Sequence, residues 1–313
     1  MSQDWNLDRV PDLSGRTMVI TGANSGIGYE AALAFASRNA SVILACRNQD
    51  KARAAADRIR REAPNAPMEL IPLDLSDLSS VHAFADAFRQ GHSTLNALIN
   101  NAGVMALPRR LTKDGFEMQL GTNHLGHFAL TGHLIDVLLA TPGSRVVNVS
   151  SIAHKFGKIR FHDLQWEKGY SKWAAYGQSK LANLLFTHEL DRRLKEAGSD
   201  TISVACHPGW AATNLQQAGP KMEGSKLMER LSAWGNAWLA QDAAAGALPT
   251  IFATVEPLRG DEYIGPTRLM GWHGPPELIE PLGKAHDPEV AERLWEESER
   301  LTGVRFLDRT SVV

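Results

Sequence analysis

The chain has little cysteine and almost no net charge, and both absences exclude classes of protein. Cys46 and Cys206 are the only cysteines among 313 residues, and they lie far apart in the sequence. Neither a disulfide framework nor a Cys-rich zinc site can be built from them, and a reducing compartment suits this composition. The 33 basic and 35 acidic residues leave a formal net charge of −2. This balance gives no electrostatic basis for binding nucleic acid or anionic lipid, so we exclude nucleic-acid partners.

Long hydrophobic runs are also missing. No stretch approaches the ~18 to 20 uninterrupted apolar residues that a membrane-spanning helix requires. The first twelve residues are polar and include Asp4, Asp8 and Asp12, which argues against a signal peptide or an N-terminal anchor. We therefore expect a cytoplasmic protein without a membrane anchor. Since 43% of the residues are hydrophobic, the chain can bury a full core, and one large domain is favoured over two small ones.

What the chain does contain is a regular alternation of apolar, β-rich runs with helical patterns. The apolar runs are continuous, which is typical of parallel strands buried on both faces. This order predicts one doubly wound α/β domain over residues 14–313, with a parallel sheet of about seven strands and helices on both faces. We expect residues 1–13 to form an N-terminal arm, 210–240 a substrate lid, and 270–313 a C-terminal extension. The runs that predict strands are 17–21, 41–46, 68–73, 95–100, 145–150 and 202–206; the predicted helices are 27–38, 51–62, 79–88, 116–139 with an interruption near Gly121 or Gly126, and 174–195.

A glycine-rich stretch, residues 21–28 (TGANSGIG), follows the first apolar run and precedes the first helical pattern. Its three glycines suit a strand–turn–helix connection in which the backbone needs unusual dihedrals and must approach a ligand closely. The free amides and the dipole of the helix start favour an anionic group such as a pyrophosphate. The glycine spacing differs from the common G-x-G-x-x-G fingerprint, so this stretch alone does not identify its ligand.

Polar or glycine-containing features follow each of the other predicted strands. They are Arg47, Asp74, residues 101–103 (Asn-Ala-Gly), residues 150–151 (Ser-Ser) and residues 207–209 (His-Pro-Gly). The carboxyl ends of parallel strands share one edge of the sheet, and ligands of such folds bind there. We expect these residues to line one site.

Tyr176 and Lys180 lie four positions apart at the start of a helical pattern, so they share a helix face. A cation beside a phenol favours the phenolate and makes tyrosine a usable acid or base near neutral pH. Taken alone, the pair is more typical of a surface tyrosine and lysine on an amphipathic helix.

The motifs occur in a characteristic order: the glycine turn, Asn-Asn-Ala-Gly at 100–103, Val-Ser-Ser at 149–151, Tyr-x-x-x-Lys at 176–180 and Pro-Gly at 208–209. In this combination, over about residues 14–215, the chain resembles the short-chain dehydrogenase/reductase family, which has a Rossmann fold. Within that family it is most similar to the retinol dehydrogenase-like group, which includes the WW-domain oxidoreductase. The narrower resemblance rests on residues 45–48 (ACRN), 122–128 (TNHLGHF), 147–154 (VNVSSIAH) and 161–164 (FHDL).

The resemblance implies a role for each matched residue. Tyr176 would be the catalytic acid or base, Lys180 would hold the nicotinamide ribose, and Ser151, in preference to Ser150, would hydrogen-bond the substrate oxygen where charge develops. Asn123 would bind a water that links Lys180 to solvent, although it could also be a polar residue that interrupts its helix. The residues that would bind the cofactor, besides Tyr176 and Lys180, are Gly22, Asn24, Ser25, Gly26, Ile27, Gly28, Arg47, Asp74, Leu75, Asn101, Ala102, Gly103, Pro208, Gly209 and Thr213.

Two of these roles bear on the adenosine end of the cofactor. Arg47 stands 19 positions after Gly28, where an acidic residue would meet a ribose 2′-hydroxyl and an arginine meets a 2′-phosphate. We therefore predict NADP(H), against the alternative of an exposed arginine at the start of a solvated helix. Asp74 would accept from the adenine amino group, or else form a turn with Ser76.

The sequence thus predicts an NADP(H)-dependent oxidoreductase that interconverts a carbonyl and an alcohol. Tryptophans at 210, 234, 238 and 272 suit an apolar cleft, so the substrate is expected to be small and lipophilic. An NADP-dependent reductase of carbon–carbon double bonds, as in protochlorophyllide reductases, and a non-catalytic NADP-binding sensor or scaffold are the alternatives. We expect no catalytic metal, because no His-Glu-x-x-His spacing occurs, and no Gly-x-Ser-x-Gly elbow supports a hydrolase. By analogy with the family, a homodimer through helices 116–139 and 174–195 is possible.

Overall fold

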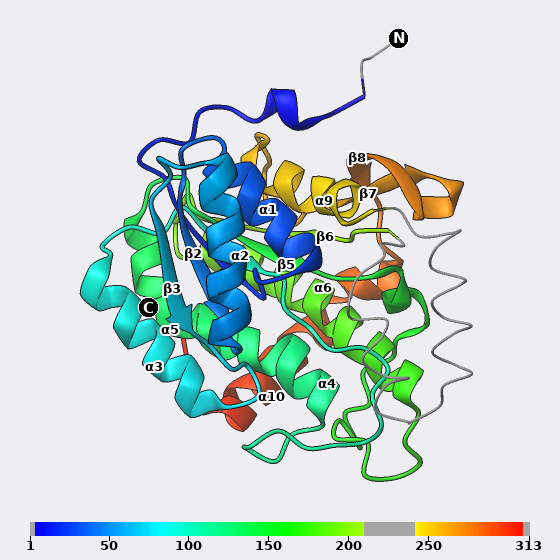
Figure 1. Ribbon diagram of the computed structural model, residues 1–313. Helices are drawn as coiled ribbons and strands as arrows, with labels where there is room; N and C mark the ends of the chain where they lie inside the picture. The colour runs from blue at the N-terminus through cyan, green and yellow to red at the C-terminus, as the bar shows by residue number, and fades with distance from the viewer. Residues whose placement is uncertain (1–3, 210–241, 309–313) are drawn as a thin grey trace, which may run out of the picture.

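An eight-stranded sheet forms the centre of the molecule (Figure 1). The computed structural model describes residues 4–209 and 242–308. The strand order is β3-β2-β1-β4-β5-β6-β7-β8, and every neighbouring pair is parallel except β7 with β8. The strands are β1 (Thr17–Thr21), β2 (Ser41–Cys46), β3 (Met68–Pro72), β4 (Ala97–Asn100), β5 (Arg145–Val149), β6 (Ile202–Cys206), β7 (Tyr263–Arg268) and β8 (His273–Ile279).

Helices cover both faces of this sheet. One face packs against α1 (Gly26–Ala36), α2 (Gln49–Glu62) and α9 (Ala243–Val255). The other packs against α3 (Leu78–Gly91), α5 (Gly126–Ala140) and α6 (Lys172–Glu196), with α10 (Pro288–Thr302) lying against α6. The doubly wound α/β fold predicted from the sequence is therefore confirmed, with eight strands in place of about seven.

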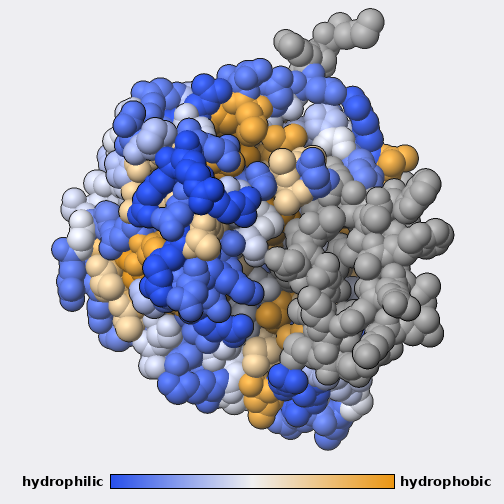
Figure 2. Space-filling view, viewed as in Figure 1, coloured by the Kyte–Doolittle hydropathy of each residue, from blue (hydrophilic) through white to orange (hydrophobic). Residues whose placement is uncertain are grey.

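The two apolar cores explain why the strand sequences are continuously hydrophobic. In β1, Met18 and Ile20 belong to the core beneath α1, whereas Val19 belongs to the core beneath α5. Successive side chains of a strand point to opposite faces, so a strand covered on both faces needs apolar residues at every position. On the surface seen in Figure 2, the outer side of α2 is hydrophilic, as expected for a helix with one face on the core.

The sequence did not predict β7 and β8, which lie near the C-terminus. These strands contain Gly265, Pro266, Gly274, Pro275 and Pro276, which are residue types that disfavour strands. The structure accommodates them because β8 is an antiparallel edge strand and the β7–β8 register shifts between Pro266 and Arg268, positions where proline is tolerated.

The N-terminal arm lies against α9. The indole of Trp5 is buried, packs on Phe252 with ring centroids 5.4 Å apart, and donates to Glu256 Oε1 at 2.6 Å. Val10 and Leu13 are also buried. The arm is thus attached to the domain by its apolar residues.

The predicted helix 116–139 is interrupted, as expected, by a π-helical segment. It consists of α4 (Met118–Leu120), the π-helical η2 (Gly121–Leu125) and α5. A Cβ atom on Gly126 would approach the Leu75 carbonyl oxygen to 2.5 Å, so glycine permits this helix to pass close to the segment that follows β3. π-helical turns occur often at functional sites, and η2 contains Asn123.

The last helix, α10, lies along α6. Trp295 stacks on Phe186 with ring centroids 5.8 Å apart, and the Arg193 guanidinium lies 4.4 Å from the centroid of Trp295. A dimer through α5 and α6 would have to use the surface that α10 leaves exposed, and it stays a prediction. Among the described residues, no helix is both long and apolar enough to cross a membrane.

Candidate active site at the carboxyl edge of the sheet

A cavity of about 870 Å³ opens at the carboxyl ends of β1 to β6. It spans the point between β1 and β4 where the strand order reverses, the usual ligand site of a doubly wound sheet. Every described residue that the sequence predicted for cofactor binding lines this cavity, and so does Ser151. Asn123 does not line it. Thr213 and the predicted lid 210–240 lie outside the described residues.

At one end of the cavity, the glycine-rich turn is fixed to the end of β4. Thr21 Oγ1 accepts hydrogen bonds from the backbone amides of Asn101 and Ala102, each at 2.9 Å, and Asn101 Nδ2 donates to Thr21 O at 2.8 Å. A Cβ atom on Gly28 would lie 2.5 Å from Asn101 Nδ2 and 2.7 Å from Gly22 O. Glycine at position 28 is therefore required for helix α1 to pack this closely against the strand ends.

The start of α1 suits the diphosphate of a dinucleotide. Gly22 and Gly26 have positive φ angles of 69° and 57°, which let the backbone turn beneath the ligand position. The N-cap residue, Ser25, makes no side-chain cap hydrogen bond, so the first amides of α1 keep their donors for an anion. The residues present therefore fit a dinucleotide at this end of the cavity.

Arg47 and Asp74 form the wall that would face the adenosine ribose. Arg47 follows β2, its side chain is 71% exposed, and its Nη1 lies 3.8 Å from Asp74 Oδ2. The other carboxylate oxygen of Asp74 accepts from Ser76 N at 3.0 Å and from Ser76 Oγ at 2.6 Å. Asp74 thus forms the turn that the sequence allowed as an alternative, and its second oxygen remains directed at Arg47. Lys51, on the first turns of α2, lines the same region.

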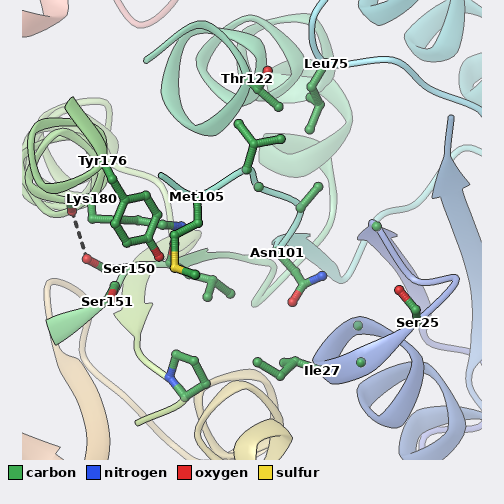
Figure 3. Close-up of a pocket in the computed structure, with 18 of the residues that line it drawn as sticks. Ser25, Ile27, Leu75, Asn101, Met105, Thr122, Ser150, Ser151, Tyr176 and Lys180 are labelled. Atoms are coloured by element: carbon green, nitrogen blue, oxygen red, sulfur yellow. Dashed lines mark hydrogen bonds between the residues drawn. The ribbon is translucent and has the colours of Figure 1, made fainter. Parts of the chain in front are cut away.

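At the other end, Tyr176 and Lys180 extend from α6 into the cavity, and Ser151 lies near them at the end of β5 (Figure 3). The Ser151 side chain lies close enough to the Tyr176 phenol to lower its pKa. Ser150 is directed differently, since its hydroxyl donates to the backbone oxygen of Lys180 at 2.8 Å. Of the two neighbouring serines, Ser151 is thus the one whose hydroxyl meets the phenol of Tyr176.

Burial controls the ionisation of this group. It raises the pKa of Tyr176 to about 12, an effect that the hydrogen bond from Ser151 partly offsets. Burial also lowers the pKa of Lys180 to about 8. The Lys180 ammonium lies 5.9 Å from the centroid of the Tyr176 ring and donates to Val149 O at 2.9 Å. Burial therefore favours the neutral phenol of Tyr176 at pH 7, and the expectation that Lys180 favours the phenolate stays a prediction.

Asn123 lies behind the cavity wall and is fully buried. Its Oδ1 accepts from Val104 N at 2.7 Å, and its Nδ2 donates to Val104 O and to Ser179 Oγ, each at 2.9 Å. Both amide hydrogens are thus used within the protein. The amide connects the segment after β4 to α6, one residue before Lys180, so its contacts position the part of α6 that carries Tyr176 and Lys180.

His127, which the sequence analysis included only as part of the motif 122–128, connects the two ends of the site. Its Nδ1 lies 3.0 Å from Asn123 O, and its Nε2 lies 2.9 Å from Thr21 Oγ1. A carbonyl oxygen can only accept, so the geometry assigns the proton to Nδ1 and makes Nε2 the acceptor from Thr21. Burial lowers the pKa of His127 to about 4, and the ring is neutral at pH 7. The side chain fixes the glycine turn relative to η2.

Several apolar residues that line the cavity were not singled out in the sequence. Met105 and Met118 line it, with Met105 beside Tyr176 (Figure 3), and Phe156 and Trp173 are aromatic side chains that are 57% and 46% exposed. Nothing in their local sequence separates methionine or phenylalanine at these positions from an ordinary core residue. Trp272, which the sequence placed near the substrate, does line the cavity.

The fold and this site together define an α/β protein with a dinucleotide-binding turn and a Tyr/Ser/Lys group, which is the arrangement of a nicotinamide-dependent oxidoreductase. The family model for short chain dehydrogenases matches residues 16–224. The chain belongs to the short-chain dehydrogenase family of oxidoreductases, which use NAD(H) or NADP(H), and within it the chain is retinol dehydrogenase-like.

Relatives cover nearly the whole chain. Human retinol dehydrogenase 12 is 44% identical over 295 residues, which are 94% of this chain and 88% of that protein. Human retinol dehydrogenase 13 is 42% identical over 294 residues, 93% of this chain and 86% of that protein. A crystal structure of an uncharacterised protein from Mycobacterium paratuberculosis superposes with a TM-score of 0.81 at 43% identity, covering 97% of this chain and 99% of that one. A short-chain dehydrogenase from Shigella flexneri complexed with NADP has the same fold, with a TM-score of 0.60 at 22% identity over 79% of this chain and 94% of that one.

Proposed function

We propose that this protein is an NADP(H)-dependent oxidoreductase that interconverts a carbonyl and an alcohol on a lipophilic substrate. One observation carries the proposal: the hydroxyls of Ser151 and Tyr176 lie in the same cavity as the first amides of α1 and the guanidinium of Arg47. A cavity with an anion site at one end and a paired proton donor at the other suits a nucleotide together with a carbonyl.

The roles of the protein groups follow from their ionisation. NADP(H), when bound, supplies or accepts the hydride. Tyr176, whose pKa is raised to about 12 by burial, holds its proton at pH 7 and donates it to the oxygen of a carbonyl as that oxygen becomes negative. Ser151 donates a hydrogen bond to the same oxygen. Lys180, with a pKa lowered to about 8, is still mainly an ammonium at pH 7, and its remaining N–H donors are available to ribose hydroxyls.

The preference for NADP(H) rests on Arg47. Its exposed guanidinium stands at the end of β2, where it can bind a 2′-phosphate with two parallel hydrogen bonds. Lys51 adds a second cation on the same wall. An acidic residue that would select the 2′-hydroxyl of NAD(H) is absent from the position that Arg47 occupies.

The substrate class follows from the apolar end of the cavity. Met105, Met118, Phe156 and Trp173 offer thioether and aromatic surface in the same cavity as Tyr176 and Ser151, and such surface binds a bulky hydrophobic carbonyl or alcohol. Relatives that share 42–44% identity with the chain are retinol dehydrogenases. Lipophilic aldehydes, with retinal among them, are therefore the first compounds to test. A cytoplasmic location stays a prediction from the sequence.

The test is an NADPH-oxidation screen over retinal, long-chain aldehydes, aromatic ketones and enones. Tyr176→Phe should abolish turnover of the best compound by at least about a hundredfold while leaving NADPH affinity unchanged, because only the proton donor is removed. Tyr29→Phe, at a buried tyrosine that does not line the cavity, is the matched control and should keep parent activity. Turnover retained in Tyr176→Phe would show that another group is the acid. NADPH binding without turnover of any compound would contradict the proposed activity.

A further inference from the structure

Three metal-ligating side chains from distant parts of the chain meet outside the active-site cavity. They are His188 on α6, Asp261 in the turn before β7, and His286 at the end of the 3₁₀ helix η5 (Gly283–His286). One ligand atom from each lies within 4.8 Å of the others. The sequence gave no sign of this group, because 73 residues separate His188 from Asp261.

We propose that His188, Asp261 and His286 form a binding site for a divalent transition metal of the Zn²⁺ type, which fastens the C-terminal segment to α6. Two imidazoles and one carboxylate are a common ligand set for zinc, with water in the fourth position. Imidazole favours Zn²⁺ and its neighbours in the periodic table, whereas Mg²⁺ and Ca²⁺ prefer oxygen ligands.

The distances agree with this ligand set. In a tetrahedral zinc site with bonds of about 2.0–2.1 Å, two ligand atoms lie about 3.3 Å apart. His286 Nδ1 is 3.5 Å from Asp261 Oδ2, and His188 Nδ1 is 2.7 Å from the same oxygen. To admit the ion, His188 Nδ1 and Asp261 Oδ2 must move apart by roughly 0.6 Å. A small rotation of either side chain allows this. A simple His–Asp ion pair needs only one imidazole. Here a second imidazole, that of His286, is directed at the same oxygen of Asp261 as His188, and this indicates a metal site.

The site is partly ordered before any ion binds. The side chains of His188, Asp261 and His286 are 20%, 27% and 35% exposed, respectively, so an ion could enter from solvent. The two rings are nearly perpendicular, with an interplanar angle of 88° and centroids 5.4 Å apart. Asp261 has a left-handed backbone, with φ 63°, and its amide donates to Ser203 O at 2.7 Å. This turn holds the carboxylate between the two histidines.

Metal binding here would stabilise the wall of the active site from behind. Two residues before His286, Lys284 donates to the backbone oxygens of Lys155 and Gly157 at 2.8 and 2.6 Å. Those oxygens lie at the end of the 3₁₀ helix η3 (Ile152–Phe156), which begins directly after Ser151. An ion on His286 would therefore fasten η5, and through Lys284 it would limit the movement of η3.

The experiment uses the full chain with its affinity tag removed and with metal removed by dialysis against EDTA. Calorimetric titration with ZnCl₂ should give one ion per chain. At a free Zn²⁺ concentration of 100 times Kd, the Tm should rise by about 4 °C. Co²⁺ should produce the visible absorption of a tetrahedral or five-coordinate N/O site, whereas Mg²⁺ and Ca²⁺ should leave the Tm unchanged.

Variants locate the ion. His286→Ala should lower Zn²⁺ affinity at least about tenfold, and Asp261→Asn should do the same while keeping the turn, because asparagine also adopts a left-handed backbone. Circular dichroism confirms that both variants are folded. The matched control is His82→Ala with His133→Ala, which removes another surface pair of imidazoles, with centroids 4.9 Å apart and Asp86 3.3 Å from His82. The control should bind zinc like the parent.

Three results would overturn the proposal. The first is the absence of stoichiometric zinc binding in the parent, which would leave the three residues as an ion-pair cluster only. The second is a parent-like response of both His286→Ala and Asp261→Asn. An equal Tm rise with Mg²⁺ would also refute the assignment to a transition metal.

Discussion

Replacing Arg47 with aspartate should reverse the proposed preference for NADP(H) over NAD(H). The guanidinium is 71% exposed and lies 3.8 Å from the 32% exposed carboxylate of Asp74. An ion pair this exposed contributes only about 0–1 kcal/mol, so Arg47 is free to leave Asp74 for a phosphate at small cost. The substitution should therefore change the stability of the protein little and its affinity for NADPH strongly.

The expected magnitude follows from the same exposure. A hydrogen bond to a charged group contributes about 1.5–3 kcal/mol, and solvent screening at Arg47 argues for the lower part of that range. A loss of about 1.5–2 kcal/mol corresponds to a 10- to 30-fold rise in the Kd for NADPH. NADH lacks the 2′-phosphate, so its Kd should stay constant or fall, because an aspartate at this position can accept from the ribose 2′-hydroxyl.

Tryptophan fluorescence offers a direct assay, because Trp173 and Trp272 line the cavity. The parent and Arg47→Asp are titrated with NADPH and NADH at constant ionic strength. The control is Arg53→Asp, which makes the same change of charge on α2 at a side chain that pairs with Asp50 and does not line the cavity. Equal parent affinities for the two nucleotides, or an equal loss in the control variant, would refute the assignment of Arg47 to the 2′-phosphate.

Two further predictions concern stability. Gly28→Ala should lower the free energy of unfolding by about 1–3 kcal/mol, measured in urea, because the new methyl group would meet backbone and side-chain atoms at 2.5–2.7 Å. The control is Gly91→Ala, where a Cβ atom meets nothing within 4 Å and the unfolding free energy should hardly change. Equal effects of the two substitutions would argue against the close packing of α1. Burial lowers the pKa of His127 to about 4 and those of His124 and His207 to about 3, so below pH 6.5 the unfolded chain binds more protons than the folded one. The free energy of unfolding should therefore be highest above pH 6.5 and decrease as the pH approaches 4, by about 2 kcal/mol per histidine at pH 5. Equal unfolding free energies in urea at pH 7 and pH 5 would contradict this.

The strands and the edge of the sheet could be predicted because their signals are local. The predicted strands 17–21, 41–46 and 202–206 coincide with β1, β2 and β6, since a strand buried on both faces is apolar throughout. The helix ends differ by a few residues where a side chain sets the boundary. Asp77, for example, accepts from Ser79 N and Ser80 N, so α3 begins at Leu78, one residue before the predicted start.

The proposed catalytic group shows where local signals end. Sequence spacing places Tyr176 and Lys180 on one helix face, and the structure brings both to the cavity. Sequence spacing could not show that Lys180 donates to Val149 O, or that burial raises the pKa of Tyr176. The ionisation of a buried group depends on every element packed around it, and those elements come from distant parts of the chain. For the same reason the link from His127 to Thr21, 106 positions away, has no sequence signature.

The C-terminal helix belongs to the scaffold of the site, although no motif in it predicted a role. Ser298 Oγ donates to Leu294 O at 2.7 Å and lies 2.8 Å from His124 Nε2. Because the Ser298 proton is already donated to Leu294 O, the Ser298 hydroxyl must accept from His124, which is therefore protonated on Nε2. Through this hydrogen bond α10 holds His124, the residue that follows Asn123 in η2. His124 is buried and uncharged, since burial lowers its pKa to about 3. The position of Asn123, and through it that of α6, therefore depends on contacts with a helix more than 160 residues later in the chain, which is why residues up to 302 are needed to explain a site whose recognisable motifs end at Gly209.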